Sequence, residues 1–232
     1  MKFRQKFLSK SVNPYYYTEI LRLEGFDIGQ GTIFYSPDTQ AIDRERPWML
    51  KIGSYCKITR GCTILTHDYS RSVLRRKYGE FVGEASITEI GNNVFIGVNS
   101  IVLMGAKIGS NVIVGAGSVV SGTIPNDVVV AGNPAKVICS LEHFFKKRKE
   151  RELESAACYF NSYYQRYGEY PAPNAKTPFF SLYTDRSAFD YANDSRMLCN
   201  GDDPNNIKND FRNTEPIFKS YNEFIEAMKT YE

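Results

Sequence analysis

His67 is the residue of this chain whose surroundings best suit acid–base chemistry. It is one of only two histidines in 232 residues, and it stands in the run Thr66-His67-Asp68-Tyr69. An imidazole exchanges protons near neutral pH, so it can take a proton from a hydroxyl group and pass it on to a leaving group. The alternative is an ordinary surface histidine. The neighbouring Asp68 could orient the imidazole, although an aspartate at such a place is as often a turn former.

A repeat of six residues surrounds His67 and must decide where its side chain points. From Ile90 to Pro125 an aliphatic residue recurs at every sixth place, and a small or β-branched residue follows four places later. A spacing of six builds no apolar face on an α-helix, and the frequent glycines argue against one long strand. The aliphatic set is Ile90, Ile96, Val102, Ile108, Val114 and Val120, and the second set is Val94, Ser100, Ala106, Val112, Ser118 and Ile124.

Three short strands joined by tight turns would make a triangular coil of 18 residues, which places Ile90 over Ile108 and Ile96 over Val114. Such like-on-like ladders are typical of a parallel β-helix. On this count His67 falls at an outward turn position that a substrate can reach. The spacing recurs upstream at Ile52, Ile58 and Ile64, with Cys56 and Cys62 in the small inward places, and more faintly at Ile28, Thr32 and Phe34.

Composition narrows the class of protein. The formal net charge of +3 and the interspersed acidic residues give no reason to expect nucleic-acid binding. No apolar run is long enough to span a membrane, and Met1 to Lys10 lacks a secretory signal, so we expect a cytoplasmic protein with no integral membrane segment. The five cysteines include no Cys-x-x-Cys pair, which favours packing residues over a disulfide or zinc framework.

The chain is predicted to have three regions. Residues 1–25 form an amphipathic cap over the first coil, through Tyr15, Tyr16, Ile20, Leu21 and Leu23. Residues 26–138 form the β-helix, with a loop at 36–51 and a longer inserted loop at 68–89. Residues 139–232 form a helical and irregular extension, with helices from Leu141 to about Tyr164 and over 216–228, and irregular chain at 171–210.

The repeat, the lone histidine before a loop and the closing run Ala131-Gly132-Asn133-Pro134-Ala135-Lys136-Val137 together resemble the hexapeptide-repeat acyltransferases. The resemblance covers about residues 26–138. It implies an all-β left-handed parallel β-helix, a homotrimer, and acetyl-coenzyme A in a groove between neighbouring subunits. Of the two histidines only His67 lies in the repeat region, so we expect no metal. The run 65–70, Leu-Thr-His-Asp-Tyr-Ser, with its long following loop most resembles the capsular and exopolysaccharide O-acetyltransferases, in which His67 would be the general base.

The resemblance also implies a set of binding residues. Asn99 could line the groove, or it is a plain turn residue. Lys136 is the best candidate for a phosphate of coenzyme A, and Phe95 matches an aromatic beside the thioester channel. The full cofactor set is Phe95, Gly97, Ala116, Ser121, Gly122, Pro134 and Lys136, with turn formation as the other reading of the glycines.

Three residues of the inserted loop, Tyr69, Arg71 and Arg75, are candidate acceptor-binding residues. Arginine forks fit carboxylates and phosphates, so the loop could fold over a neighbouring subunit and bind an acidic sugar or a phosphorylated carrier. The alternative is a solvated charge run.

Two positions depart from the pattern of the simple sugar acetyltransferases. Val98 replaces a serine that helps to hold the oxyanion, so an amide N–H near Gly97 or Val98 would have to serve. Gly122 replaces a lysine, which leaves more of the phosphate binding to Lys136. Both changes favour the polysaccharide-modifying branch.

The sequence predicts an acetyltransferase that moves acetyl from acetyl-coenzyme A to a hydroxyl of a polysaccharide, its repeat unit or a linked sugar. Two alternatives remain: N-acetyl transfer to an amino sugar or small amine, and a non-catalytic trimeric binding scaffold. A γ-type carbonic anhydrase is disfavoured, because it needs three histidines around one metal. The acceptor, the acetylated position and the role of residues 139–232 stay open.

Overall fold

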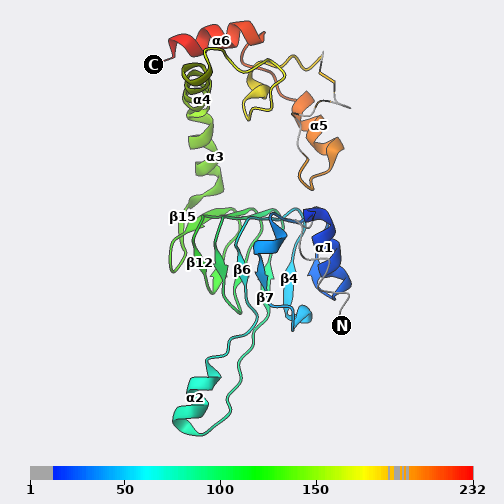
Figure 1. Cartoon of the computed structure of the whole chain (residues 1–232), viewed down its shortest axis with the longest axis vertical. Coiled ribbons are helices and arrows are strands. Elements are labelled where there is room, and N and C mark those ends of the chain that lie inside the picture. Colours follow the sequence, from blue (N-terminus) through cyan, green and yellow to red (C-terminus); the bar gives the residue numbers. More distant parts are fainter. Residues whose placement is uncertain (1–12, 188, 191–193, 195, 197–198, 232) are drawn as a thin grey trace. The chain divides into compact units, whose positions relative to one another are not determined.

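The computed structural model describes residues 13–187, 189–190, 194, 196 and 199–231. It consists of two compact units, Met1–Phe144 and Phe145–Glu232, each with its own hydrophobic core (Figure 1). The expectations for Met1 to Lys10 lie outside the described residues. No helix in the described part of the chain is both long and apolar enough to cross a membrane.

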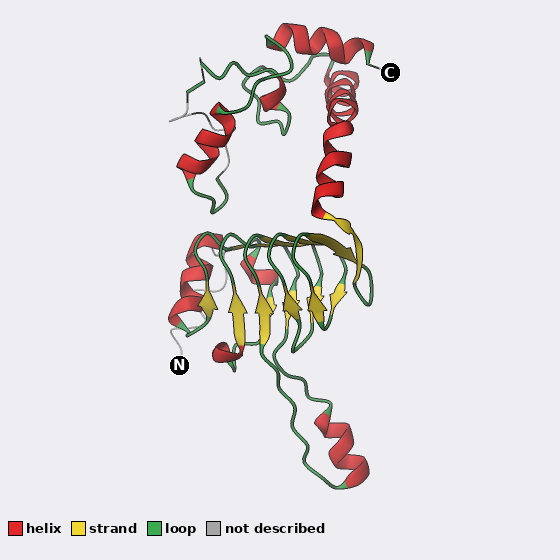
Figure 2. Ribbon diagram, turned by 180° about the vertical axis from the view of Figure 1, so that it is seen from behind, coloured by secondary structure: helices red, strands yellow, loops and turns green. Residues whose placement is uncertain are grey.

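The first unit is a three-sided parallel β-helix whose short strands stack in register (Figure 2). Sheet A holds β1 (Asp27–Ile28), β4 (Leu50–Ile52), β7 (Thr88–Ile90), β10 (Lys107–Ile108) and β13 (Thr123–Ile124). Sheet B holds β2 (Ile33–Phe34), β5 (Lys57–Ile58), β8 (Val94–Ile96), β11 (Val112–Val114), β14 (Val128–Ala131) and the antiparallel β15 (Lys136–Ser140). Sheet C holds β3 (Ala41–Ile42), β6 (Thr63–Ile64), β9 (Ile101–Val102) and β12 (Val119–Val120).

The predicted ladders are confirmed. Ile90 pairs with Ile108 and Ile96 with Val114, and all four side chains are buried inside the three-sided β-helix, which we call the prism. Ile124 is an exception, because it pairs with Ile108 and therefore stands in the aliphatic column and not in the column of small residues. The last coil is two residues shorter than the others of the repeat, which moves the register at that place.

The small inward positions are filled as expected. Cys56 and Cys62 are buried free thiols, with Sγ atoms 3.1 Å from the carbonyl oxygen of Gly91 and 3.4 Å from that of Gly97. Burial raises the pKa of both thiols, so they stay protonated and serve as packing groups.

Helix α1 (Pro14–Leu23) packs on the first coil, but not through the predicted face. Tyr17, Thr18 and Leu21 are buried, and the ring of Tyr17 meets that of Phe34 edge-on at 5.5 Å. The other predicted contact residues, Tyr15, Tyr16, Ile20 and Leu23, are exposed. Of the predicted contact residues only Leu21 belongs to the buried face of α1, which also includes Tyr17 and Thr18.

The segment 36–51, predicted to be a loop, is largely part of one coil of the β-helix. It contains the 3₁₀ turns η1 (Pro37–Thr39) and η2 (Pro47–Met49), strand β3, which pairs with β6, and the start of β4. The insertion at 68–89 contains helix α2 (Arg71–Tyr78), and the strand resumes at Thr88, one residue before the predicted end of the insertion.

The second unit holds α4 (Glu152–Tyr167), η3 (Phe180–Leu182), α5 (Pro204–Arg212) and α6 (Tyr221–Thr230), while α3 (Leu141–Glu150) spans the boundary between the units. The helix predicted from Leu141 is thus divided at Arg151. Helix α6 starts later than predicted, because Ser220 caps it by accepting from the amide of Glu223 at 3.2 Å. Helix α5 lies partly where irregular chain was expected.

Candidate active site

His67 is held by a carboxylate that the sequence analysis missed. The pairing of β3 with β6 puts Asp43, one residue beyond β3, beside the segment that follows Ile64, and the amide of Asp43 donates to the carbonyl of Ile64 at 3.1 Å. Nδ1 of His67 is hydrogen-bonded to Oδ2 of Asp43, and the hydroxyl of Thr66 donates to the same oxygen. The side chain of Asp43 is 4% exposed and that of His67 is 27% exposed.

The surroundings of Asp43 keep it ionised. Burial by itself would raise its pKa, but the hydrogen bonds from Thr66 and His67 outweigh burial, so the pKa of Asp43 lies below its ordinary value of 3.8. Nη1 of Arg46, 4.0 Å from Oδ2, adds a compensating positive charge. An ionised carboxylate at Nδ1 fixes the tautomer in which Nδ1 carries the hydrogen and Nε2 presents its lone pair.

Nε2 of His67 faces the accessible side of the site. It lies 4.0 Å from Oε2 of Glu45, whose side chain is 79% exposed. That separation is too long for a hydrogen bond, so Nε2 can accept a proton from an incoming group.

Asp68 does not make the hydrogen bond that orients the imidazole. Its carboxylate accepts from the amide and the hydroxyl of Ser70, at 2.9 and 2.7 Å, and these bonds lower its pKa. Asp68 thus forms the turn that leads into α2, and the orienting contact to Nδ1 comes from Asp43.

The inserted arm, residues 68–87, is anchored where it leaves the prism. His67 and Ala85 form an antiparallel bridge, and the amide of Ser86 donates to the carbonyl of Thr66 at 3.1 Å. The hydroxyl of Thr88 donates to the carbonyl of Leu65 at 2.7 Å. These bonds fix the backbone on which the imidazole is mounted.

The predicted site residues lie at two different corners of the prism. His67, Ser121 and Gly122 lie between sheet C and sheet A, because they follow β6 and β12. Asn99 and Ala116 lie between sheet B and sheet C, after β8 and β11. One copy of the chain therefore does not bring His67 and Asn99 together.

The remaining cofactor candidates lie at the corner between sheet B and sheet C, with Asn99 and Ala116, or next to sheet C. Phe95 is exposed on β8, and Gly97 begins the turn between β8 and β9. A Cβ on Gly97 would come 2.5 Å from the amide nitrogen of Ala116, so glycine is required there for stacking. Pro134 and Lys136 are exposed, and the amide of the intervening Ala135 donates to the carbonyl of Val119 at 2.8 Å.

Of the two amides expected to stabilise the oxyanion, those of Gly97 and Val98, the Gly97 amide already makes a backbone hydrogen bond. The amide of Gly97 donates to the carbonyl of Val114 at 2.8 Å and is thus already used. Asn99 has φ +59°, and its amide donates to the carbonyl of Arg60 at 3.0 Å, so it does form a turn.

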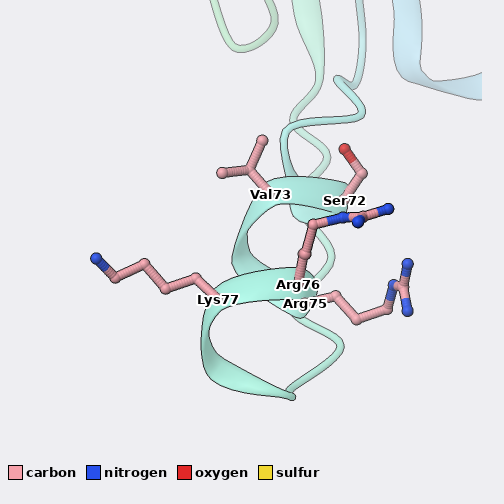
Figure 3. A pocket seen from close by; sticks show the side chains of 5 residues that line it. All are labelled: Ser72, Val73, Arg75, Arg76 and Lys77. Carbon is pink, nitrogen blue, oxygen red and sulfur yellow. The ribbon is translucent and has the colours of Figure 1, made fainter.

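Tyr69, Arg71 and Arg75 lie on the arm, where α2 has no buried residue. The guanidinium of Arg71 lies 5.1 Å from the ring centre of Tyr69, and that of Arg75 lies 5.6 Å from the ring centre of Phe81. A hollow of about 350 Å³ on α2 is lined by Ser72, Val73, Arg75, Arg76 and Lys77, and Lys77 points away from the two arginines (Figure 3). All of its lining comes from one helix and includes neither His67 nor Asp43.

Comparison with known proteins assigns the family. The family described as bacterial transferase hexapeptide (six repeats) matches residues 87–122. Protein CapG of Staphylococcus aureus is 44% identical over 127 residues, which cover 55% of this chain and 73% of CapG. The chain belongs to the bacterial hexapeptide-repeat transferases. The parallel sheets fit the left-handed β-helix of this family.

Two further relatives of this family bear on the chemistry. WbbJ of Escherichia coli strain K12, named as an O-acetyl transferase of lipopolysaccharide biosynthesis, is 34% identical over 139 residues, covering 53% of this chain and 67% of WbbJ. A 2,3,4,5-tetrahydropyridine-2,6-dicarboxylate N-acetyltransferase of Clostridium perfringens is 48% identical over 61 residues, covering 26% of each chain.

Proposed function

We propose that this transferase moves an acetyl group from acetyl-coenzyme A to a hydroxyl of a polysaccharide, its repeat unit or a linked sugar. The observation that carries the proposal is the buried Asp43 carboxylate on Nδ1 of His67, which leaves Nε2 available on the accessible side. The likeness to WbbJ supports a sugar hydroxyl as the acceptor.

In the proposed reaction, Nε2 of His67 takes the hydroxyl proton as the acceptor oxygen forms a bond to the thioester carbonyl carbon. The carbon–sulfur bond then breaks, and the proton passes from Nε2 to the coenzyme A thiolate. Asp43 stays ionised throughout and stabilises the imidazolium that forms in between. Acetyl is transferred whole, and no metal or oxidant takes part.

The two groups of site residues support a homotrimer as the active form. His67, Ser121 and Gly122 are at one corner, and Gly97, Asn99 and Ala116 are at another. A neighbouring copy that presents its second corner to the first corner of this copy would complete one groove from both groups. We propose that acetyl-coenzyme A lies in that groove, with Lys136 at a phosphate.

The exposed arm fits the same arrangement. Its apolar side chains, including Val73, Tyr78 and Phe81, are exposed in the single chain, which suits a contact with a neighbouring copy or an acceptor. Arg71 and Arg75 would then meet an acidic sugar or a phosphorylated carrier.

The test is acetyl-coenzyme A consumption against a panel of sugars, sugar nucleotides and oligosaccharides, with products identified by mass spectrometry. We expect His67→Ala to lower transfer by about 10²–10⁴-fold while coenzyme A binding, measured by calorimetry, and the melting temperature stay unchanged. Retention of more than about a tenth of the activity would exclude His67 as the base. Failure of the wild type to bind coenzyme A would favour a non-catalytic scaffold.

N-acetyl transfer is the second candidate, favoured by the likeness to the Clostridium perfringens N-acetyltransferase. Treatment of the product with alkaline hydroxylamine separates the two, because it removes acetyl esters and leaves acetyl amides intact. A resistant product would assign the chain to N-acetylation.

A further inference from the structure

The second unit contains a cavity of about 330 Å³ between the segment 170–173 and helix α6. Its apolar lining includes Tyr170, Pro171, Pro173 and Tyr221. Pockets that hold small ligands begin at about this size and combine apolar walls with a few polar groups. No residue of the His67 site contributes to it.

The aromatic wall of the cavity is held in place from behind. The hydroxyl of Tyr221 donates to the carbonyl of Pro171, and that of Tyr170 donates to Oδ1 of Asn161 at 3.2 Å. Burial, with the nearby Tyr183 and Tyr170, raises the pKa of Tyr221 to about 12, so Tyr221 carries no charge at neutral pH. Both tyrosines thus present fixed rings to a ligand.

The polar side of the cavity comes from α6. Asn222, Glu226 and Lys229 line it at exposed positions one turn apart, and Nζ of Lys229 is 2.5 Å from Oε1 of Glu226. The two opposite charges balance, so the cavity favours a neutral ligand with several hydrogen-bonding groups over a phosphate or carboxylate.

The aromatic surface extends beyond the cavity. The ring of Tyr164 stacks on that of Tyr170 with centres 4.8 Å apart and planes inclined by 22°, and Tyr164 is 47% exposed. The apolar C–H face of a sugar ring packs flat on such a surface, while its hydroxyl groups reach the polar side chains at the edge.

We propose that this cavity is a carbohydrate subsite that holds part of a neutral glycan chain away from the reacting hydroxyl. Identification of that glycan as the acceptor rests on the proposed function, whereas binding itself does not. The volume suits one or two sugar rings, so the subsite would act on oligosaccharides and polymers and contribute nothing with a monosaccharide acceptor.

The test uses the full-length His67→Ala chain, which prevents turnover, and neutral hexasaccharides of glucose, galactose and N-acetylglucosamine as probes. Saturation-transfer NMR titration measures binding. For the hexasaccharide that the parent chain binds most tightly, we expect the subsite variant Asn222→Ala/Glu226→Ala/Lys229→Ala to have a dissociation constant at least tenfold higher. The matched control, Asn206→Ala/Lys208→Ala/Asp210→Ala on α5, should bind as the parent does.

Two results would overturn the proposal of a subsite. The first is that the parent chain binds none of the hexasaccharides. The second is that the subsite variant and the control bind equally well while both keep the melting temperature of the parent. If the subsite variant has a lower melting temperature than the parent, the single variants Asn222→Ala and Lys229→Ala replace it in the same comparison with the control.

The three substitutions of the subsite variant are also made in the wild-type chain, where His67 is intact. Loss of hexasaccharide binding in the His67→Ala background, with intact acetyl transfer to a monosaccharide in the wild-type background, would uphold the subsite. Hexasaccharide binding by a wild-type chain that transfers no acetyl group to any acceptor would instead contradict the proposed function alone.

Discussion

Nδ1 of His67 is hydrogen-bonded to the carboxylate of Asp43, a residue 24 positions earlier in the chain. The parallel pairing of β3 with β6 brings the two together, and the hydroxyl of Thr66 binds the same carboxylate oxygen. The orientation of the imidazole is thus built into two successive rungs of the prism.

Asp43→Asn is expected to lower the turnover rate by about 10²-fold or more, because an amide at this place can hold Nδ1 in the wrong tautomer. The Michaelis constant for acetyl-coenzyme A should change little, since Asp43 is buried behind the imidazole. Steady-state kinetics of purified protein measures both quantities.

Asp68→Asn is the matched control for that variant. Its carboxylate binds Ser70, and an asparagine oxygen can accept the same two bonds, so activity should stay within about twofold of wild type. Equal losses in Asp43→Asn and Asp68→Asn would contradict the assignment of Asp43.

The lowered pKa of Asp43 predicts a pH dependence of stability. The folded state binds this proton less tightly than the unfolded chain does, so Asp43 contributes stability above the ordinary carboxyl pKa of 3.8 and loses it as the pH falls through the folded value. Urea unfolding of wild type and Asp43→Asn should therefore differ by a constant amount between about pH 5 and 8 and converge below about pH 4. A difference that stays constant into acid would show that the carboxylate charge is not the cause.

Gly97→Ala is expected to destabilise the prism by about 2 kcal/mol or more, since the added Cβ would lie 2.5 Å from the amide nitrogen of Ala116. For a chain of this size that is a drop of roughly 4–8 °C in melting temperature. Gly83→Ala on the arm is the control, because nothing lies within 4 Å of its Cβ. A normal melting temperature for Gly97→Ala would mean that the coils separate more easily than the structure indicates.

Removal of the two arginines Arg71 and Arg75 from the arm is expected to change acceptor selectivity without affecting folding. Arg71→Ala/Arg75→Ala should raise the Michaelis constant for acidic acceptors severalfold and leave that for neutral acceptors unaffected, because a guanidinium group attracts a carboxylate or phosphate and not a neutral sugar. The ring contacts of both arginines, with Tyr69 and Phe81, lie within the arm. The melting temperature should move by less than about 1 °C. Equal effects on neutral and acidic acceptors would remove the arginines from acceptor binding.

The repeat could be predicted from the sequence because stacked coils require like residues at a fixed spacing. Ile90 over Ile108 and the buried Cys56 and Cys62 follow from that rule alone. It fails where a coil changes length. Ile42 lies eight residues after Phe34 in place of six, so the repeat predicts a loop where β3 lies and does not indicate Asp43.

The missed carboxylate did leave a signal. Ala41 and Ile42 are followed directly by Asp43, which gives an apolar pair with an acid at its end, and the apolar pair Ile64-Leu65 is likewise followed by the polar Thr66 and His67. An alignment of Ile42 with Ile64, with gaps allowed at the corners, places Asp43 opposite Leu65 and within two residues of His67. The second unit offered no repeat to align, and its aromatic core joins residues as distant as Phe160 and Phe224.

Chain length varies repeatedly at one edge of the prism, the corner between sheet C and sheet A. The steps from Ile42 to Ile52, from Ile64 to Ile90 and from Val120 to Ile124 all depart there from the spacing of six, while the paired rungs on either side remain in register. Lengthening a closed loop costs only about 0.6 kcal/mol per doubling. Evolution can therefore exchange whole segments beside His67 and create new specificities without rebuilding the scaffold.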